Sequence, residues 1–330
     1  MSLEQLKHYP VMLNQIISII SPQHGGTFID CTFGGGGYSK AILNFPNTNV
    51  IALDRDDSVK KYANVLLKQF PNRFNFFQNK FSNLEKIVKP NDNPKAIIFD
   101  LGLSSFQIDD SNRGFSFKNR GPLNMQMGIN TFSAHEAINK LKNNQLTYIL
   151  KLLGQEKDAK KIVKKIDKYR KKKLINFTDE LSLIIKSAKK NYRKFKIDPA
   201  TKTFQAIRIF VNQELSELIF GLIAATKLLK EGDVLIVVSF HSLEDKIVKD
   251  FFNLNSKNPS RYLPLQEDKR KLFDLFSKKP ITPDKNEIEK NVRSRSAKLR
   301  YGIRSNENFF YPEEFKKNFL HYLKLNEMKI

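Results

Sequence analysis

The stretch that decides the fold reads FIDCTFGGGGY, residues 28–38, in which a short apolar strand runs into a turn of four glycines. Two further apolar strands, expected at 49–54 and 95–100, end in Asp54 and Asp100. Glycine lets the backbone approach a ligand closely, and an acid that ends the next strand can accept hydrogen bonds from ribose hydroxyls. The pattern predicts an open, Rossmann-like α/β sheet with a nucleotide pocket at the glycine turn.

The glycine turn departs from the dinucleotide signature. G-x-G-x-x-G needs a third glycine so that the helix packs closely on the strand. Here that position holds Ser39 or Lys40, depending on which glycine starts the motif. A turn of this kind suits a nucleoside with an amino-acid tail, and S-adenosylmethionine is such a molecule. A glycine-rich turn without any ligand is the alternative.

Helix and strand signals alternate along the first hundred residues. Apolar residues recur at helical spacing over about 11–20, which predicts an amphipathic first helix. The elements expected after it are strands at 27–31, 49–54, 74–78 and 95–100, and helices at 38–45, 57–69 and 82–88. Such alternation predicts a parallel sheet with helices on both faces.

The pattern changes after Asp100. Turn-forming residues dominate 101–131, and residues 133–192 read as helices without a strand signal. A long helical pattern follows at 203–229, and strand character returns at 234–239 and near 297–303. We therefore expect an all-helical domain inserted into the α/β domain, with parts at 1–106, 107–200 and 201–330.

The chain is strongly basic. Its net charge of +23 arises from 57 Lys and Arg against 34 Asp and Glu. An excess of this size predicts a polyanionic partner, and we favour nucleic acid over a membrane surface or a codon bias toward lysine. The charge is densest in the insert, where ten basic residues lie between Lys157 and Lys173. A second cluster comprises Lys186, Lys189, Lys190, Arg193, Lys194 and Lys196, with Tyr192 and Phe195 interleaved. Phosphate contact is the functional interpretation of both clusters, and a solvated helix face is the alternative.

Cysteine content and hydropathy exclude several classes of protein. Cys31 is the single cysteine, so neither a disulfide nor a cysteine metal site can form within the chain. No apolar run approaches the length of a membrane span, and the start lacks a secretory signal pattern. We expect a cytoplasmic protein that needs neither metal nor membrane.

Three polar motifs are candidates for chemistry. Asp100 opens DLGL at the end of a strand, where amino-group methyltransferases place an acid or amide that accepts hydrogen bonds from the target amine. His241 follows the strand at 234–239 and is a weak candidate for the catalytic base, while Ser242 and Asp245 resemble a helix capping pair. The basic run at 291–300 is either a phosphate contact or a charged strand edge.

Taken together, the motifs closely resemble the RsmH (MraW) family of 16S ribosomal RNA cytosine-N4 methyltransferases. The resemblance covers nearly the whole chain. The segments that carry it are HYPVML (8–13), DCTFGGGG (30–37), DRD (54–56), DLGLSSFQIDD (100–110), RGFSF (113–117), TFQAIRI (203–209), SFHSLED (239–245) and RSRSAKLR (293–300).

The resemblance implies a fold, a cofactor and a substrate. The fold is a class I S-adenosylmethionine-dependent methyltransferase domain with an inserted helical domain. The substrate is a cytosine in the decoding centre of 16S rRNA, within the small ribosomal subunit. The cofactor contacts fall on Gly36, Gly37, Tyr38, Asp54, Phe81, Asp100 and Gln107, with Asp54 on the ribose diol and Phe81 at the adenine.

The chain departs from the family at two places. Tyr38 stands where the family usually has His, and the loop 121–128 reads GPLNMQMG in place of GPLDMRMD. The loop has lost three charged side chains, which bears on catalytic rate and on RNA contact. The altered loop keeps a non-catalytic RNA-binding factor that retained the fold open as an alternative. A DNA amino-methyltransferase is the alternative among enzymes, although the Pro-Pro-aromatic motif common after its acid or amide is absent here.

Overall fold

The computed structural model describes residues 10–189, 197–257 and 271–328 and divides the chain into two compact units. The first unit comprises residues 1–102 and 215–320, and the second comprises 103–214 and 321–330.

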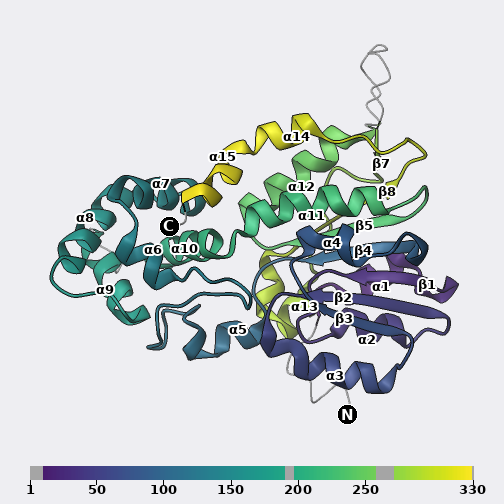
Figure 1. The fold of residues 1–330 in the computed structure, drawn as a ribbon, viewed down its shortest axis with the longest axis horizontal. Coiled ribbons are helices and arrows are strands. Elements are labelled where there is room, and N and C mark those ends of the chain that lie inside the picture. Colours follow the sequence, from purple (N-terminus) through teal and green to yellow (C-terminus); the bar gives the residue numbers. More distant parts are fainter. Residues whose placement is uncertain (1–9, 190–196, 258–270, 329–330) are drawn as a thin grey trace. The chain divides into compact units, whose positions relative to one another are not determined.

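The first unit is built on an eight-stranded sheet in the order β3-β2-β1-β4-β5-β8-β7-β6 (Figure 1). Its strands are β1 (Gly26–Asp30), β2 (Thr48–Asp54), β3 (Phe74–Gln78), β4 (Pro94–Asp100), β5 (Val234–Ser239), β6 (Ser256–Lys257), β7 (Phe273–Asp274) and β8 (Lys298–Arg304). Strands β1 to β5 are parallel as predicted, whereas β8 runs antiparallel to β5, with Leu299 opposite Val238. This is a class I methyltransferase sheet, and its strand order reverses between β1 and β4, where open α/β sheets bind ligands.

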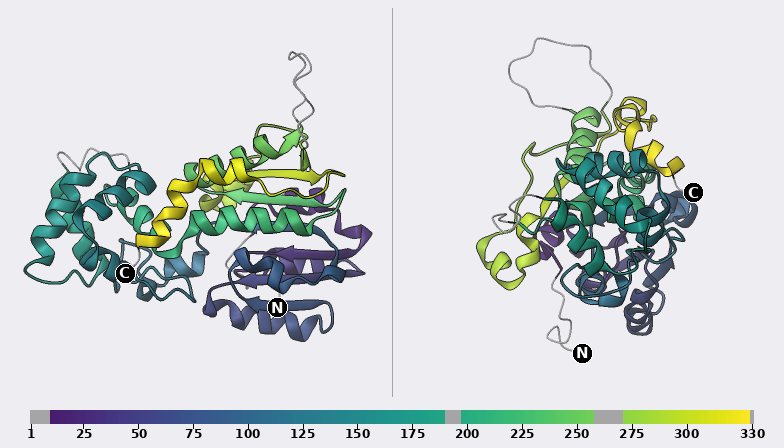
Figure 2. Two further views of the ribbon diagram at one scale, coloured as in Figure 1. Left: turned by 45° about the horizontal axis from the view of Figure 1, so that its top comes forward. Right: turned by 90° about the vertical axis from the view of Figure 1, so that its left-hand side faces the viewer.

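Helices cover both faces of this sheet (Figure 1 and Figure 2). The helices of this unit are α1 (Leu13–Ile20), α2 (Gly37–Leu43), α3 (Lys60–Gln69), α4 (Leu84–Ile87), α11 (Glu214–Leu228), α12 (Ser242–Asn255), α13 (Lys285–Lys290) and α14 (Glu313–Asn318), of which α14 packs on α12 through Phe315 and Phe251. Alternate residues of the strands point to opposite faces, so that Ile98 belongs to the apolar core beside α1, α2 and α3, while Phe99 packs near Gly221 of α11. The central strands are apolar on both faces because both faces are covered.

The second unit is helical. Its helices are α5 (Ser105–Asp109), α6 (Ala134–Lys140), α7 (Asn143–Gly154), α8 (Ala159–Arg170), α9 (Thr178–Ala188) and α10 (Thr201–Asn212), and the short α15 (Leu320–Leu323) lies near the chain end. Within the described part of this unit, the β structure is a single isolated bridge between Pro122 and Phe177. The expected run of helices after the turn-rich segment is thus observed.

Two expectations about the insert differ from the structure. The boundary expected at residue 200 lies after Glu214, because α10 packs on α7 in the second unit, where a Cβ on Gly154 would come within 2.6 Å of the Lys202 carbonyl. The single helix expected at 203–229 is two helices, α10 and α11, because the backbone of Gln213 is left-handed with φ 55° and its N–H closes the end of α10.

Within the described residues no single helix has the length and apolar character needed to span a membrane; α10 and α11 pass that test only when they are joined across their break.

Candidate active site

Three of the four glycines in the turn have a structural reason. Gly34 and Gly36 have φ values of 52° and 78°, in the left-handed region that favours glycine. A Cβ on Gly36 would lie 2.8 Å from the Phe33 ring, and one on Gly37 would lie 2.2 Å from the ring of Pro10. Close packing therefore requires glycine at 36 and 37, where β1 passes into α2, and the left-handed backbone favours glycine at 34.

Asp54 ties the end of β2 to this turn. Its Oδ2 accepts the backbone N–H of Gly34 at 2.8 Å, and its Oδ1 accepts that of Asp56 at 2.8 Å. Burial raises the pKa of the Asp54 carboxyl, and the two backbone hydrogen bonds oppose that rise. Each oxygen keeps a lone pair, so the carboxylate can still accept hydrogen bonds from a ribose diol.

Asp30 was not singled out from the sequence, yet it organises the turn. Its fully buried carboxylate accepts the Ser39 hydroxyl at 2.7 Å and the backbone N–H of Thr32 at 3.2 Å. Burial is the main reason why the pKa of Asp30 rises to about 6. The signal was available: Asp30, Asp54 and Asp100 each end a strand of the same parallel sheet.

Asp100 lies at the carboxyl end of β4, beside the turn. Its backbone N–H donates to Thr32 Oγ1 at 2.7 Å, and its Oδ2 lies 3.3 Å from the Tyr38 hydroxyl. Its Oδ1 is buried and has no hydrogen-bond partner among the described residues. Burial raises the pKa of Asp100 to about 8, and the carboxylates of Asp30, Glu244 and Glu287 add to the rise. A buried acceptor without a partner fits a ligand that brings a donor or a positive charge.

Tyr38 is buried at the start of α2. Its hydroxyl donates to the carbonyl of Val11 at 2.5 Å, so it holds the segment before α1 against the turn. Burial and nearby Asp100 raise the pKa of Tyr38 well above its usual value. The ring thus links the glycine turn to both Val11 and Asp100.

Phe81 follows β3 and packs against two other elements. Its ring meets that of Phe99 edge-on, with centroids 5.2 Å apart, and a Cβ on Gly221 of α11 would come within 2.6 Å of it. These contacts fix the ring at the carboxyl end of the sheet. Its role at an adenine stays a prediction.

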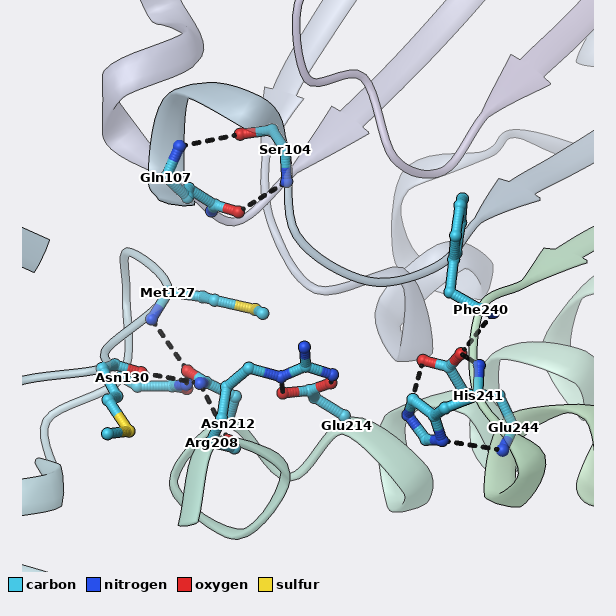
Figure 3. Close-up of polar contacts among 11 residues, drawn as sticks. Ser104, Gln107, Met127, Asn130, Arg208, Asn212, Glu214, Phe240, His241 and Glu244 are labelled. Atoms are coloured by element: carbon cyan, nitrogen blue, oxygen red, sulfur yellow. Dashed lines mark hydrogen bonds and ion pairs between the residues drawn. The ribbon is translucent and has the colours of Figure 1, made fainter. Parts of the chain in front are cut away.

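Gln107 belongs to the second unit. Its Oε1 accepts the backbone N–H of Ser104 at 3.0 Å, and its own N–H donates to Ser104 Oγ at 3.3 Å (Figure 3). This reciprocal pair caps α5. The expected cofactor contact of Gln107 stays a prediction.

The loop at 121–128, whose sequence differs from that of the family, is held by amide side chains. Asn212 Oδ1 accepts the backbone N–H of Met127 and the amide of Asn130, both at 2.8 Å (Figure 3). Asn124 Oδ1 accepts the backbone N–H of Gln126, whose own side chain donates to the carbonyl of Asn130. The residues that replace the expected charges therefore serve the loop itself.

His241 caps α12, and here the sequence interpretation was wrong in one detail. The capping pair is His241 with Glu244 rather than Ser242 with Asp245: Glu244 Oε2 accepts the backbone N–H groups of Phe240 and His241, at 2.9 and 3.3 Å (Figure 3). The His241 ring accepts the Glu244 N–H at Nδ1, and its Nε2 lies 3.1 Å from Glu244 Oε1, off the direction of a hydrogen bond. Its role as a base stays a prediction.

The basic run before β8 is partly structural. Asp245 accepts hydrogen bonds from Lys298 at 2.8 Å and from Arg300 at 2.9 Å. Partial burial raises the pKa of Asp245, but the hydrogen bonds and charges of these two cations outweigh burial and lower it. These two residues therefore fasten α12 to β8. Arg293 and Arg295 are exposed.

The two basic clusters of the insert differ. Helix α8 buries Ile162, Val163 and Ile166, as expected, and its lysines are exposed. Six exposed lysines of this stretch have no ion-pair partner within the described residues: Lys157, Lys160, Lys164, Lys165, Lys168 and Lys172.

The second cluster is not a free basic face where it is described. Lys189 forms a buried ion pair with Glu156 at 2.6 Å, and Lys186 pairs with Asp198 at 3.0 Å. Its remaining members, Lys190, Arg193, Lys194 and Lys196, with Tyr192 and Phe195, lie outside the described residues.

Comparison with known proteins identifies the family of the chain. A model of the MraW methylase family matches residues 5–304. Proteins named ribosomal RNA small subunit methyltransferase H are 44% identical to the chain over 299 residues in Ehrlichia canis and over 298 in Rickettsia africae, covering 89% of this chain and 98% and 96% of theirs. A solved rRNA methylase from Streptococcus thermophilus aligns over 88% of this chain and 96% of its own, at 8% identity and a TM-score of 0.39. The chain belongs to the MraW methylase family.

Proposed function

We propose that this protein uses S-adenosylmethionine to methylate the exocyclic N4 amine of a cytosine in the decoding centre of 16S rRNA. The observation that carries the proposal is the position of Asp100 at the carboxyl end of β4, next to the glycine turn, with one buried carboxylate oxygen unpartnered. The names of the relatives support an rRNA substrate in the small ribosomal subunit.

The chain has the residues needed to hold the cofactor. The glycine turn lies at the carboxyl end of β1, where open α/β sheets bind nucleotides, and Gly36 and Gly37 belong to the proposed contacts; Asp54, bonded to Gly34, can accept the ribose hydroxyls. Phe81 would line the adenine pocket, and Tyr38, Asp100 and Gln107 complete the proposed contacts. S-adenosylmethionine supplies an already activated methyl group, so positioning accounts for most of the expected acceleration.

Asp100 has the chemistry to handle the target amine. An ionised carboxylate accepts a hydrogen bond from the amine and leaves the nitrogen lone pair free. The pKa of about 8 suits a group that takes up a proton near neutral pH, as the nitrogen must lose one. We therefore prefer Asp100 to His241 as proton acceptor, because Nδ1 of His241 already accepts the backbone N–H of Glu244. To reach Asp100, the target cytosine must flip out of its RNA context.

The lysine face of α8 suits the RNA backbone. Its exposed lysines project opposite the buried stripe of Ile162, Val163 and Ile166. Lysine ammonium groups bind phosphates as point charges without reading sequence, so this face would position the RNA rather than select the base.

The test is methyl transfer from labelled S-adenosylmethionine to small ribosomal subunits that lack the modification, followed by identification of the nucleoside. We expect N4-methylcytidine with the wild-type protein and a loss of at least about 100-fold with Asp100→Ala. Asp274→Asn, at an exposed position on β7, is the matched control and should retain activity.

Other outcomes decide between the alternatives. Undiminished transfer by Asp100→Ala would remove Asp100 from the mechanism. Cofactor binding without transfer would favour a non-catalytic RNA-binding factor, and preferred transfer to duplex DNA would favour a DNA amino-methyltransferase. His241→Ala with normal turnover would leave Asp100 as the sole candidate base in the described residues.

A further inference from the structure

We propose that Tyr38 is a positioning residue for Asp100: its hydroxyl connects the carboxylate to the carbonyl of Val11 and reverses its hydrogen-bond direction when Asp100 gains or loses a proton. The proposal rests on the proposed function in so far as Asp100 is the residue that meets the target amine. Nothing in the chemistry of methyl transfer itself requires a tyrosine at this position.

The geometry places one hydroxyl between two acceptors. Tyr38 Oη lies 2.5 Å from the carbonyl oxygen of Val11 and 3.3 Å from Oδ2 of Asp100. A phenol has one proton to donate and lone pairs that accept. It can therefore donate to only one of these two oxygens at a time.

The two protonation states of Asp100 use the hydroxyl in opposite ways. When Asp100 is protonated, its carboxyl proton is donated to Tyr38 Oη and Tyr38 donates to Val11, so that both protons and the Val11 carbonyl have a partner. When Asp100 is ionised, the Tyr38 proton turns to Oδ2 and makes a charge-assisted bond, which is stronger than a neutral one. Burial of the Tyr38 ring and the fixed Val11 backbone hold the hydroxyl in reach of both partners.

Among the described residues, the charged groups that act most strongly on the pKa of Asp100 are acidic. Asp30 from β1, Glu244 from α12 and Glu287 from α13 face it and oppose ionisation, as burial does. The hydroxyl of Tyr38 is the group in this set that favours the ionised form. Removing it should therefore make Asp100 harder to ionise.

The segment before α1 makes the arrangement rigid. The backbone N–H of Met12 donates to Glu287 Oε1 at 2.5 Å, and Pro10 packs on Gly37. Met12 is fully buried with a left-handed φ of 55°. The Val11 carbonyl thus has fixed neighbours on both sides. Because the Tyr38 hydroxyl is bonded to this carbonyl, it is held at a fixed place beside Asp100.

The first experiment needs no cofactor and no substrate. Carbon-13 NMR of aspartate carboxyls, with Asp100 assigned by its loss in Asp100→Asn, gives the midpoint of its titration. We expect Tyr38→Phe to raise this midpoint by about one pH unit, since a hydrogen bond to a charged group is lost. Tyr301→Phe, on β8 of the same unit, is the control and should leave it unchanged. An unchanged midpoint in Tyr38→Phe overturns the proposal.

A second measurement uses the wild-type side chain, so it stands even if Tyr38→Phe does not fold. With tyrosine labelled at Cζ, the Tyr38 signal should shift at the same midpoint as Asp100, and the shift should vanish in Asp100→Asn. A flat Tyr38 signal across that range contradicts the proposal.

Activity gives an independent readout. The acidic limb of the kcat profile should move to higher pH in Tyr38→Phe, with little change in the KM for the ribosomal subunit. Failure of the proposed function would instead abolish turnover in the wild type, while the cofactor-free titrations would still report the link between Tyr38 and Asp100.

Discussion

Thr32 Oγ1 accepts the backbone N–H of Asp100 at 2.7 Å, which fastens the glycine turn to the end of β4. Thr32 lies two residues after the end of β1, and its own N–H donates to Asp30. One short chain of hydrogen bonds therefore runs from Asp30 through Thr32 to Asp100. These hydrogen bonds join the ends of β1 and β4, between which the strand order of the sheet reverses and where a ligand is expected.

Replacing Thr32 with Val keeps the shape of the side chain and removes the acceptor. The Asp100 N–H is then left without its partner, so we expect a loss of about 1–3 kcal/mol in the free energy of unfolding. Urea denaturation measures the loss. Thr32→Ser, which keeps the hydroxyl, should recover most of it; equal losses in both variants would show that the methyl group matters instead.

Asp100→Asn should stabilise the cofactor-free protein at high pH. The folded-state pKa of about 8 lies above the unfolded value of 3.8, so the stabilising effect of protonation is complete below 3.8 and is lost as pH rises through 8. The asparagine variant has no charge to bury. We expect its advantage to grow between pH 4 and 8 and to reach on the order of 5 kcal/mol, with about 2–4 °C in Tm per kcal/mol.

Thermal unfolding of the wild type, Asp100→Asn and Asp274→Asn at pH 5, 7 and 9 tests this. The control substitution lies at an exposed position, so its difference from the wild type should not depend on pH in this range. A pH-independent difference for Asp100→Asn would mean that Asp100 is not held protonated by burial. A gain in stability together with a loss of activity would mark Asp100 as a strained functional group.

Much of the first unit could be predicted from local patterns. Each of the strands ending in Asp30, Asp54 and Asp100 is a short apolar run with a polar end, and the glycine turn follows the first of them directly. Such signals lie within about ten residues of one another, where spacing alone carries the information.

The parts that could not be predicted depend on distant contacts. The contact of Tyr38 with Val11 spans 27 residues, and that with Asp100 spans 62. The break at Gln213 leaves the helical pattern uninterrupted in sequence, since glutamine is a good helix former. The roles of Glu244 and Asp245 depended on whether α12 begins at Ser242, and helix starts are poorly fixed by sequence.

The ion pair between Lys189 and Glu156 predicts an asymmetric response to mutation. Both side chains are buried, and Lys189 also donates to the carbonyl of Pro199 at 2.7 Å. Glu156→Gln leaves a buried ammonium without its counter-charge, which we expect to cost about 3–5 kcal/mol. Glu156→Leu combined with Lys189→Met should cost clearly less, as measured by denaturant unfolding. If the loss of unfolding free energy in the double variant equals the sum of the losses in Glu156→Leu alone and Lys189→Met alone, the two charges are not coupled.

The exposed lysines of α8 should contribute to RNA affinity. Lys164 and Lys168 are exposed on one face of the helix, four residues apart, with no ion-pair partner among the described residues. If each contacts a phosphate, Lys164→Gln with Lys168→Gln should lower affinity for small ribosomal subunits and reduce the slope of log K against log salt by about 1.4–1.8. Lys61→Gln with Lys68→Gln, on exposed positions of α3, removes the same net charge and is the matched control. An equal change in both pairs would point to general electrostatic attraction by the +23 net charge, whereas a change confined to α8 would place the RNA backbone on this helix.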